Sequence, residues 1–271
     1  MPDSNINETL VATAFTQQSS KFDRLYSEDT IIQYKRKRVR DHLSKFIFPD
    51  QNILEINCGT GEDAIWLAQQ SCKVHATDIA AAMLEILDQK LKSDGLENLI
   101  SHEICSFTTL ENLQQKGPFD LIFSNFAGLN CTGELNKVLA SFKALLKPKG
   151  IVTLVILPKF CLWEFLLIFR GKVRTATRRF FSRNGASAKV EKTNFKCWYY
   201  NPSYVMKYVK NDFDLLSIEG LCTIVPPSYI EHFAEKSPKL FSMLCKKENA
   251  LKNKWPWKYI GDYYIISLQK K

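Results

Sequence analysis

Short apolar runs alternate with stretches of helical periodicity through the middle of the chain. The apolar runs predict strands over residues 52–57, 73–77, 99–104, 119–124 and 151–157, the third being the weakest. The stretches between them predict helices over residues 62–70, 80–92 and 133–146. Strands that alternate with helices of this length connect by right-handed crossovers, so the pattern predicts a parallel sheet with helices on both faces.

The pattern changes on both sides of this region. Residues 7–48 read as helical, and residues 159–201 form an aromatic and basic insertion. Two more apolar stretches, 213–225 and 263–269, predict strands, the second at an edge of the sheet, with a helical insertion between them. We expect one α/β domain, residues 1–271, with four parts: a helical lid (1–48), a core (49–158), a cap insertion (159–212) and C-terminal strands with their insertion (213–271).

Composition and charge narrow the class of protein. A hydrophobic content of 45% suffices for one good-sized core, and 37 Lys+Arg against 28 Asp+Glu give a net charge of +9. This charge suits an anionic partner, and a solvated basic surface is the alternative. The start of the chain lacks the features of a secretory signal, no apolar run is long enough to span a bilayer, and the eight cysteines lack metal-site spacing. We expect a soluble cytoplasmic protein without disulfides or a metal.

A glycine-rich turn follows the first strand and opens a helix. This arrangement points backbone N–H groups and a helix N-terminus at a ligand. Glu62 and Asp63 would repel a pyrophosphate there, whereas Asp78, at the end of the second strand, can accept both hydroxyls of a ribose. A ligand with a ribose and without a charged phosphate fits better, and S-adenosylmethionine is the common one.

Four motifs in order carry a family resemblance over about residues 15–157. E-I-N-C-G-T-G, residues 55–61, resembles the E-x-G-x-G-T-G signature of class I S-adenosylmethionine-dependent methyltransferases. The second, fourth and fifth motifs of that family are similar to V-H-A-T-D-I-A-A-A-M-L, F-D-L-I-F-S-N-F-A-G-L-N and L-L-K-P-K-G-I-V-T-L. The chain is most similar to the small-molecule branch that includes the quinone-type methyltransferases. The resemblance implies a Rossmann-like, doubly wound, seven-stranded, mostly parallel sheet with an antiparallel last strand, a helical lid and cap insertions.

The resemblance also implies which residues bind the cofactor. Gly59 and Gly61 would let the backbone approach its methionine part, Asp78 would hold the ribose, and Ile79 and Met83 would flank the adenine. The remaining cofactor residues implied by the motifs and the lid are Tyr26, Glu55, Asn57, Cys105, Ser106 and Asn125. The product would be S-adenosylhomocysteine.

Two of these positions depart from the family pattern. Cys105, followed by Ser106, stands where many relatives have an aspartate that meets the adenine amine, so adenine recognition would rest on backbone groups. Asn57 replaces the first glycine of the turn, but asparagine tolerates positive φ better than other non-glycine residues, so we expect the turn to form. A degenerate site that has lost its cofactor is the alternative.

Methyl transfer is an in-line displacement that mainly requires alignment of the acceptor, with a general base only where the acceptor loses a proton. His232 is the candidate base for a hydroxyl acceptor; Glu164 is a second candidate, unless it only pairs with Arg170. The acceptor should lie at the carboxyl ends of the strands, under aromatic residues of the insertions. The candidate substrate-binding residues are Phe126, Phe160, Trp163, Tyr199, Tyr200 and Tyr229, although packing of the insertion against the core is the simpler role.

Two motifs of nucleobase-modifying methyltransferases are missing from the sequence, and this narrows the class of methyl acceptor. The site after the fourth strand lacks the Pro-Pro of base-modifying enzymes, and no cysteine follows a proline. We therefore expect O-methylation, or else C-methylation, of a small hydrophobic or aromatic molecule. An RNA-directed methyltransferase and a non-catalytic binding protein of the same fold are the alternatives.

Two basic stretches leave the partners open. Residues 170–183 carry six Arg and Lys residues interleaved with Phe180 and Phe181, which suits peripheral docking to an anionic membrane, phosphate contact with RNA, or a solvated face. The run of residues 35–40 could join any of these, and more simply it is the outer face of the lid helix.

Overall fold

The computed structural model describes residues 2–271, with side chains from residue 6 onward. Seven strands form one sheet in the order β3-β2-β1-β4-β5-β9-β8. They are β1 (Asn52–Ile56), β2 (Lys73–Asp78), β3 (Ile100–Ile104), β4 (Phe119–Ser124), β5 (Leu146–Ile156), β8 (Phe213–Leu221) and β9 (Tyr263–Lys270). The first five are parallel, and β9 is antiparallel to both of its neighbours. The predicted fold is confirmed.

The edge position predicted for residues 263–269 is wrong. β9 lies between β5 and β8, and β8 is the edge strand. Five consecutive residues of β9, from Tyr264 to Leu268, are buried, which requires cover on both faces of the sheet. At the other edge, β3 has only Ile100 fully buried, which explains its weaker apolar pattern.

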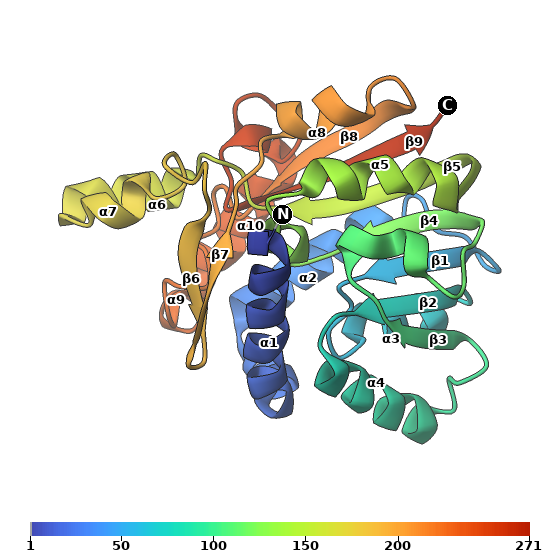
Figure 1. Cartoon of the computed structure of the whole chain (residues 1–271). Helices are drawn as coiled ribbons and strands as arrows, with labels where there is room; N and C mark the ends of the chain where they lie inside the picture. Colours follow the sequence, from blue (N-terminus) through green and yellow to red (C-terminus); the bar gives the residue numbers. More distant parts are fainter. Residues whose placement is uncertain (1) are drawn as a thin grey trace.

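Helices cover both faces of the sheet (Figure 1). Because side chains alternate along a strand, Ile53 packs in the cluster with α2 (Thr30–Leu43), α3 (Glu62–Gln69) and α4 (Ala81–Asp94). Leu54, its neighbour, packs in the cluster with α5 (Leu135–Leu145) and α8 (Pro202–Val209). Two buried clusters, one on each face, therefore fix the sheet.

The N-terminal segment forms two helices. α1 (Pro2–Glu28) contacts α4 of the core and β7 (Thr193–Cys197) of the cap insertion. It ends before Asp29, whose carboxylate accepts the Ile32 N–H at 2.8 Å and so caps α2. This cap explains why the helical segment predicted over residues 7–48 is broken at residue 29.

The insertions are the parts that stand furthest from the sheet. The first contains α6 (Leu162–Leu166), η3 (Leu167–Arg170) and α7 (Val173–Thr177), which project from the body, and a hairpin of β6 (Ala186–Val190) and β7 (Thr193–Cys197) (Figure 1). The second contains α9 (Phe233–Lys236), α10 (Pro238–Leu251) and η4 (Trp257–Tyr259). Within residues 2–271, no helix combines the length and the hydropathy needed to cross a bilayer. The division of the chain into lid, core, cap and C-terminal part stays a prediction.

Lys35, Arg36 and Arg38 of the basic run do not face outward, so the interpretation of this run as the outer face of the lid helix is wrong for these three residues. Lys35 is 3% exposed and Arg36 and Arg38 are each 5% exposed, whereas Lys37 between them is exposed. Arg38 pairs with Glu219 at 3.5 Å and with Glu248 at 3.2 Å. Buried charges persist where they are paired, and these carboxylates, from β8 and α10, hold α2 against the sheet.

Candidate functional site

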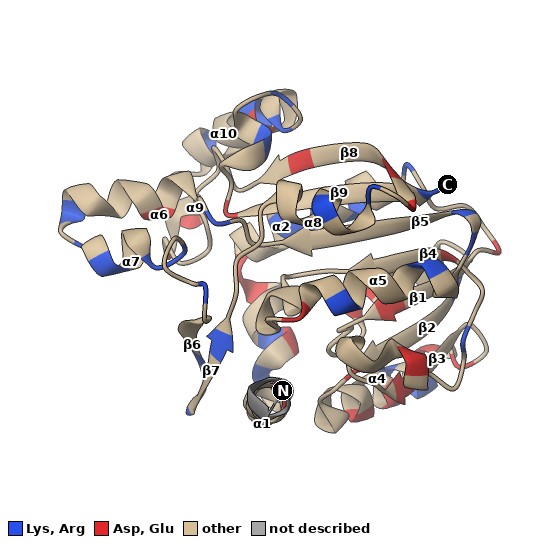
Figure 2. Ribbon diagram, turned by 45° about the horizontal axis from the view of Figure 1, so that its top comes forward, with Lys and Arg blue, Asp and Glu red and all other residues tan. Residues whose placement is uncertain are grey.

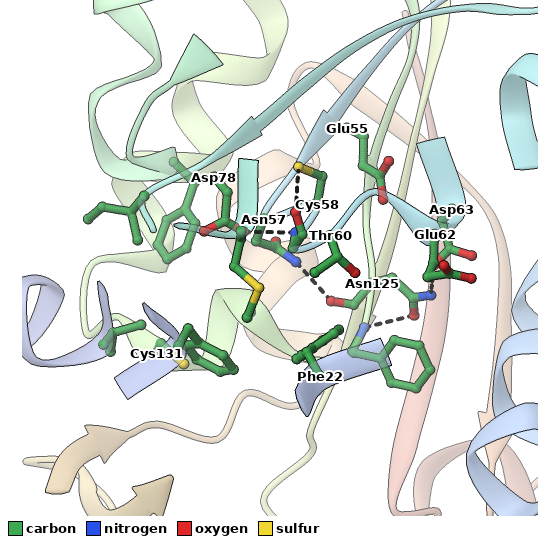
Figure 3. Close-up of a pocket in the computed structure, with 18 of the residues that line it drawn as sticks. Phe22, Glu55, Asn57, Cys58, Thr60, Glu62, Asp63, Asp78, Asn125 and Cys131 are labelled. Atoms are coloured by element: carbon green, nitrogen blue, oxygen red, sulfur yellow. Dashed lines mark hydrogen bonds between the residues drawn. The ribbon is translucent and has the colours of Figure 1, made fainter. Parts of the chain in front are cut away.

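A pocket lies at the carboxyl ends of β1, β2 and β4, beneath α1 (Figure 3). It is lined by residues from six segments: Val11, Phe15, Phe22, Tyr26, Arg36, Glu55, Asn57, Cys58, Gly59, Thr60, Glu62, Asp63, Asp78, Ile79, Met83, Cys105, Phe107, Asn125, Phe126, Gly128 and Cys131. All the cofactor residues predicted from the sequence line it, except Gly61 and Ser106. The structure thus brings together residues that the motifs place up to a hundred positions apart.

The turn after β1 has the left-handed conformation at three positions. The φ angles are 53° at Asn57, 56° at Gly59 and 78° at Gly61. A Cβ on Gly61 would lie 2.2 Å from Leu87 Cδ1, so this glycine allows the turn to pack on α4 rather than to touch a ligand. At Gly59 a Cβ would meet only the Phe22 ring, at 3.7 Å.

Asn57 is held by hydrogen bonds to the loop after β4. The Ser124 hydroxyl donates to Asn57 Oδ1 at 2.6 Å, and Asn57 Nδ2 donates to the Asn125 carbonyl at 2.9 Å. Gly128 leaves room for this side chain, because a Cβ there would lie 2.4 Å from Asn57 Cγ. The asparagine therefore keeps the turn and ties it to the neighbouring strand.

Asp78 joins the turn to the end of β2. Its carboxylate accepts the Gly59 N–H and the Ala80 N–H, both at 2.9 Å. Burial raises the pKa of Asp78, and the hydrogen bonds from Ala80 and Gly59 oppose that rise. The carboxylate lies on the pocket wall, where hydroxyl groups of a ligand can reach it.

Glu55 carries an oxygen without a partner. Oε2 is buried and, within the described residues, makes no hydrogen bond. Burial raises the pKa of Glu55 well above its usual range, and the nearby Asp63 adds to the rise. A buried polar atom without a partner is unfavourable by about 1–3 kcal/mol. Because Glu55 lines the pocket, a hydrogen-bond donor on a ligand would relieve this cost (Figure 3).

Asp63 organises the end of the pocket near Asn125. It pairs with Arg36 at 3.0 Å and with Arg40 at 2.9 Å, and it accepts Asn125 Nδ2 at 2.7 Å. The Arg36 guanidinium lies 4.9 Å from the centroid of the Phe126 ring. This end therefore combines a fixed amide, a paired guanidinium and an aromatic face.

The opposite end of the pocket is apolar and contains Ile79, Met83, Cys105 and Phe107. Burial raises the pKa of the Cys105 thiol to about 11, so it is a neutral, weak hydrogen-bond partner. Ser106 points elsewhere: its hydroxyl accepts the Thr108 N–H at 3.2 Å and donates to Glu8 on α1 at 2.9 Å.

The helix α1 covers the pocket. Phe22 and Tyr26 stack at 4.1 Å, and Tyr26 meets the edge of Phe126 at 5.9 Å. Asp23 fastens the cover, since it accepts the Thr60 hydroxyl at 2.5 Å and pairs with Lys90 at 2.7 Å. α1 is thus held closed by both aromatic and polar contacts.

The structure does not bring most of the predicted substrate residues to this pocket; only Phe126 lines it. The Tyr200 hydroxyl donates to the Thr132 carbonyl at 2.5 Å, and Tyr199 lies under the Arg179 guanidinium at 5.0 Å. Phe160 packs on Phe165 and Phe180, Trp163 is half-buried, and Tyr229 is exposed. The contacts of Tyr199, Tyr200 and Phe160 are those of residues that pack the insertion.

Neither candidate base lies in the pocket. His232 is exposed in a separate groove, which it shares with Glu28, Asp29 and Glu231. Glu164 is buried and pairs with Arg178 and Arg179, both at 2.7 Å, so its predicted pairing with Arg170 is wrong. The reason is that Arg170 ends a separate helical turn, η3, and points to solvent.

Sequence reasoning missed Arg36 as a pocket residue. The spacing of residues along α2 could have predicted which face of this helix is buried. Residues on that face recur at helical spacing and all are buried: Ile31, Lys35, Arg38, Val39 and His42. This spacing identifies the buried face. It does not identify Arg36, whose burial depends on Asp63 and Phe126 from distant segments.

Comparisons with known proteins agree with this geometry. Residues 53–150 match the family described as methyltransferase domain. The chain is 28% identical over 153 residues to the demethylmenaquinone methyltransferase of Lactococcus lactis, an alignment that covers 55% of this chain and 59% of that protein. The chain therefore spans less than two thirds of that relative.

Solved structures share the fold. The 1,6-didemethyltoxoflavin-N1-methyltransferase of Burkholderia thailandensis has a TM-score of 0.58 at 12% identity, over 99% of this chain and 90% of that one. A geranyl diphosphate methyltransferase in complex with S-adenosylmethionine has a TM-score of 0.55 at 13% identity, over 87% of this chain and 84% of that one. At these identities the likeness concerns the fold.

Proposed function

We propose that the chain is a class I S-adenosylmethionine-dependent methyltransferase, and that it transfers a methyl group from S-adenosylmethionine to a small, apolar or aromatic acceptor. The observation that carries the proposal is the pocket itself. It joins the glycine-rich turn, a carboxylate at the end of β2 and an unpaired buried carboxyl oxygen under one helical cover.

The residues present fit this cofactor. The methionine ammonium would meet the free Glu55 oxygen, and the ribose hydroxyls would meet Asp78. The adenine would lie among Ile79, Met83 and Cys105, whose neutral surroundings suit an uncharged ring. Gly59 would allow close approach of the backbone.

The bound cofactor would supply an electrophilic methyl group on a sulfonium, and the protein would align the acceptor with it. Phe126, Tyr26 and Phe22 form an aromatic wall at the end of the pocket nearest Asn125. This wall would orient a flat, apolar acceptor, and the closed α1 would exclude water. Arg36 would balance negative charge at that end.

We propose oxygen as the acceptor atom and carbon as the next choice. A hydroxyl acceptor must lose its proton, and His232 lies outside the pocket, so the proposed oxygen acceptor would enter the pocket already ionised, with Arg36 beside it. The Lactococcus lactis relative is named for demethylmenaquinone, and the solved relative is named for geranyl diphosphate. Both names describe acceptors with large apolar parts, and they support the apolar class of the proposed acceptor.

The experiment supplies the purified protein with methyl-labelled S-adenosylmethionine and an extract of its own host. The extract is then separated into lipid-soluble, water-soluble and RNA fractions, with an RNase-treated control. Label in a lipid-soluble or small-molecule fraction is the expected result. Label that disappears with RNase would instead identify an RNA-directed enzyme, and absence of both label and S-adenosylhomocysteine binding would identify a non-catalytic protein.

A further inference from the structure

The projecting pair of helices in the first insertion exposes apolar side chains. We call residues 162–183, which contain α6, η3 and α7, the cap hairpin; it is a helical hairpin and does not include the β6–β7 hairpin. Phe169 and Phe181 are each 83% exposed, and Val173 is 55% exposed. Monomeric proteins rarely leave such side chains grouped in water unless something covers them.

The tip of the cap hairpin alternates apolar and basic residues. Residues 169–174 read F-R-G-K-V-R, and all six are exposed. No acidic residue occurs between residues 165 and 190. Among the described residues, Arg170, Lys172 and Arg174 have no carboxylate partner within ion-pair distance. Figure 2 shows this positive charge at the outer end of α6 and on α7.

The base of the cap hairpin is fixed, in contrast to its tip. Arg179 pairs with Glu164 and with Asp262, each at 2.7 Å, and donates to the Pro158 carbonyl at 3.2 Å. Arg178 adds a second contact to Glu164 at 2.7 Å. Although burial opposes it, these arginines lower the pKa of Glu164, so the carboxylate stays charged and the network stays closed. The tip is therefore held away from the body.

We propose that the tip of the cap hairpin docks on an anionic lipid bilayer. Phe169 and Val173 would enter the interface between headgroups and acyl chains, and Arg170, Lys172 and Arg174 would contact lipid phosphates. An RNA backbone would neutralise the same charges but would leave the phenylalanine and valine uncovered. The cap hairpin follows β5 at the carboxyl edge of the sheet, and the pocket lies at the same edge, so docking would turn this edge of the sheet toward the membrane.

The test measures co-sedimentation of the full chain with vesicles of phosphatidylcholine, with and without phosphatidylglycerol. We expect binding to the anionic vesicles that weakens as salt is added. Phe169→Asp should weaken it about tenfold or more, since it removes an inserted ring. R170E/K172E should weaken it at least tenfold, because each basic residue near the surface contributes roughly fivefold and reversal adds repulsion.

Matched control variants test whether the loss of vesicle binding is specific to the tip or follows from any loss of an exposed phenylalanine or of positive charge. Phe48→Asp changes a phenylalanine that is 64% exposed at the opposite edge of the sheet, and K246E/K247E makes the same charge change on α10. Both should bind vesicles within about twofold of the unaltered protein. Phe169→Leu should keep binding, which covers the case in which Phe169→Asp fails to fold.

Four results would overturn the proposal. The first is no binding to anionic vesicles, and the second is equal loss in the tip and control variants. The third is a dimer in size-exclusion chromatography that Phe169→Asp converts to a monomer. The fourth is binding to RNA, lost in R170E/K172E, by a protein that does not bind vesicles. Since the assay uses no methyl donor, its outcome is independent of the proposed methyl transfer.

Discussion

Asparagine at position 57 is expected to stabilise the turn, so restoring the family glycine there should harm the protein. Asn57→Gly removes the hydrogen bonds to Ser124 and Asn125, which contribute about 1 kcal/mol each. Glycine also gains up to about 1 kcal/mol of backbone freedom in the unfolded chain. Glycine adopts the left-handed conformation without the steric strain of asparagine, and relief of this strain stabilises the folded state by roughly 1 kcal/mol. The net loss of unfolding free energy is about 2 kcal/mol.

Two measurements check this value. Urea unfolding gives the free-energy change directly, and calorimetry should show a melting temperature lowered by about 4–8 °C for a chain of this size. The space that Gly128 leaves for Asn57 would also empty, so titration with S-adenosylhomocysteine should show weaker binding.

Glu191→Gly is the matched control. Glu191 also has a positive φ, of 50°, but its side chain is partly exposed and has an ion pair with Lys21 at 3.8 Å. Its replacement should therefore leave stability unchanged or slightly higher. If Asn57→Gly is as stable as the unaltered protein while Glu191→Gly is stabilised, the two hydrogen bonds contribute nothing and the reasoning fails.

Four further predictions concern the pocket and the candidate base. Asp78→Ala should weaken S-adenosylhomocysteine binding at least a hundredfold in calorimetry, whereas Asp88→Ala on the surface of α4 should not; similar losses would refute the ribose role. Because burial raises the pKa of Asp78, that affinity should fall as the pH is lowered through the raised pKa, and a fall only at alkaline pH would contradict this. Asp23→Ala should speed S-adenosylhomocysteine release several-fold in stopped flow, since it frees α1 from Thr60 and Lys90, and an unchanged rate would show that aromatic contacts alone hold it. His232→Ala should retain turnover of the labelled acceptor, and a loss above tenfold would restore it as the base.

The core of the fold could be predicted from the sequence because its strands and helices each have a regular apolar period. The order of the last two strands could not be, because β8 and β9 are both apolar and only tertiary pairing decides which is covered. The family motifs led to the pocket because they follow the strand ends of the sheet. The buried basic face of α2 was missed because Arg38 is paired with Glu219 and Glu248, which follow it by 181 and 210 residues.

The insertions were harder still. Tyr199 and Tyr200 resemble a substrate cover in composition, but their contacts are with Arg179 and Thr132. Aromatic content alone does not tell packing from recognition, because both uses bury a ring. For the tip at residues 169–174, the sequence showed the basic charge, but it did not show that these residues project from the body and are exposed.

The helix α1 has a consequence for the order of events in a catalytic cycle. Its first turns are bound to two places at once, because Asn7 donates to the Cys131 carbonyl at 2.7 Å and accepts the Lys196 N–H at 2.7 Å. Its far end is held by Thr60 and Lys90. Exchange of the spent cofactor must therefore break contacts to the core and to the insertion together. We expect release of the methylated product to precede that exchange, with the opening of α1 as the slowest step of the cycle.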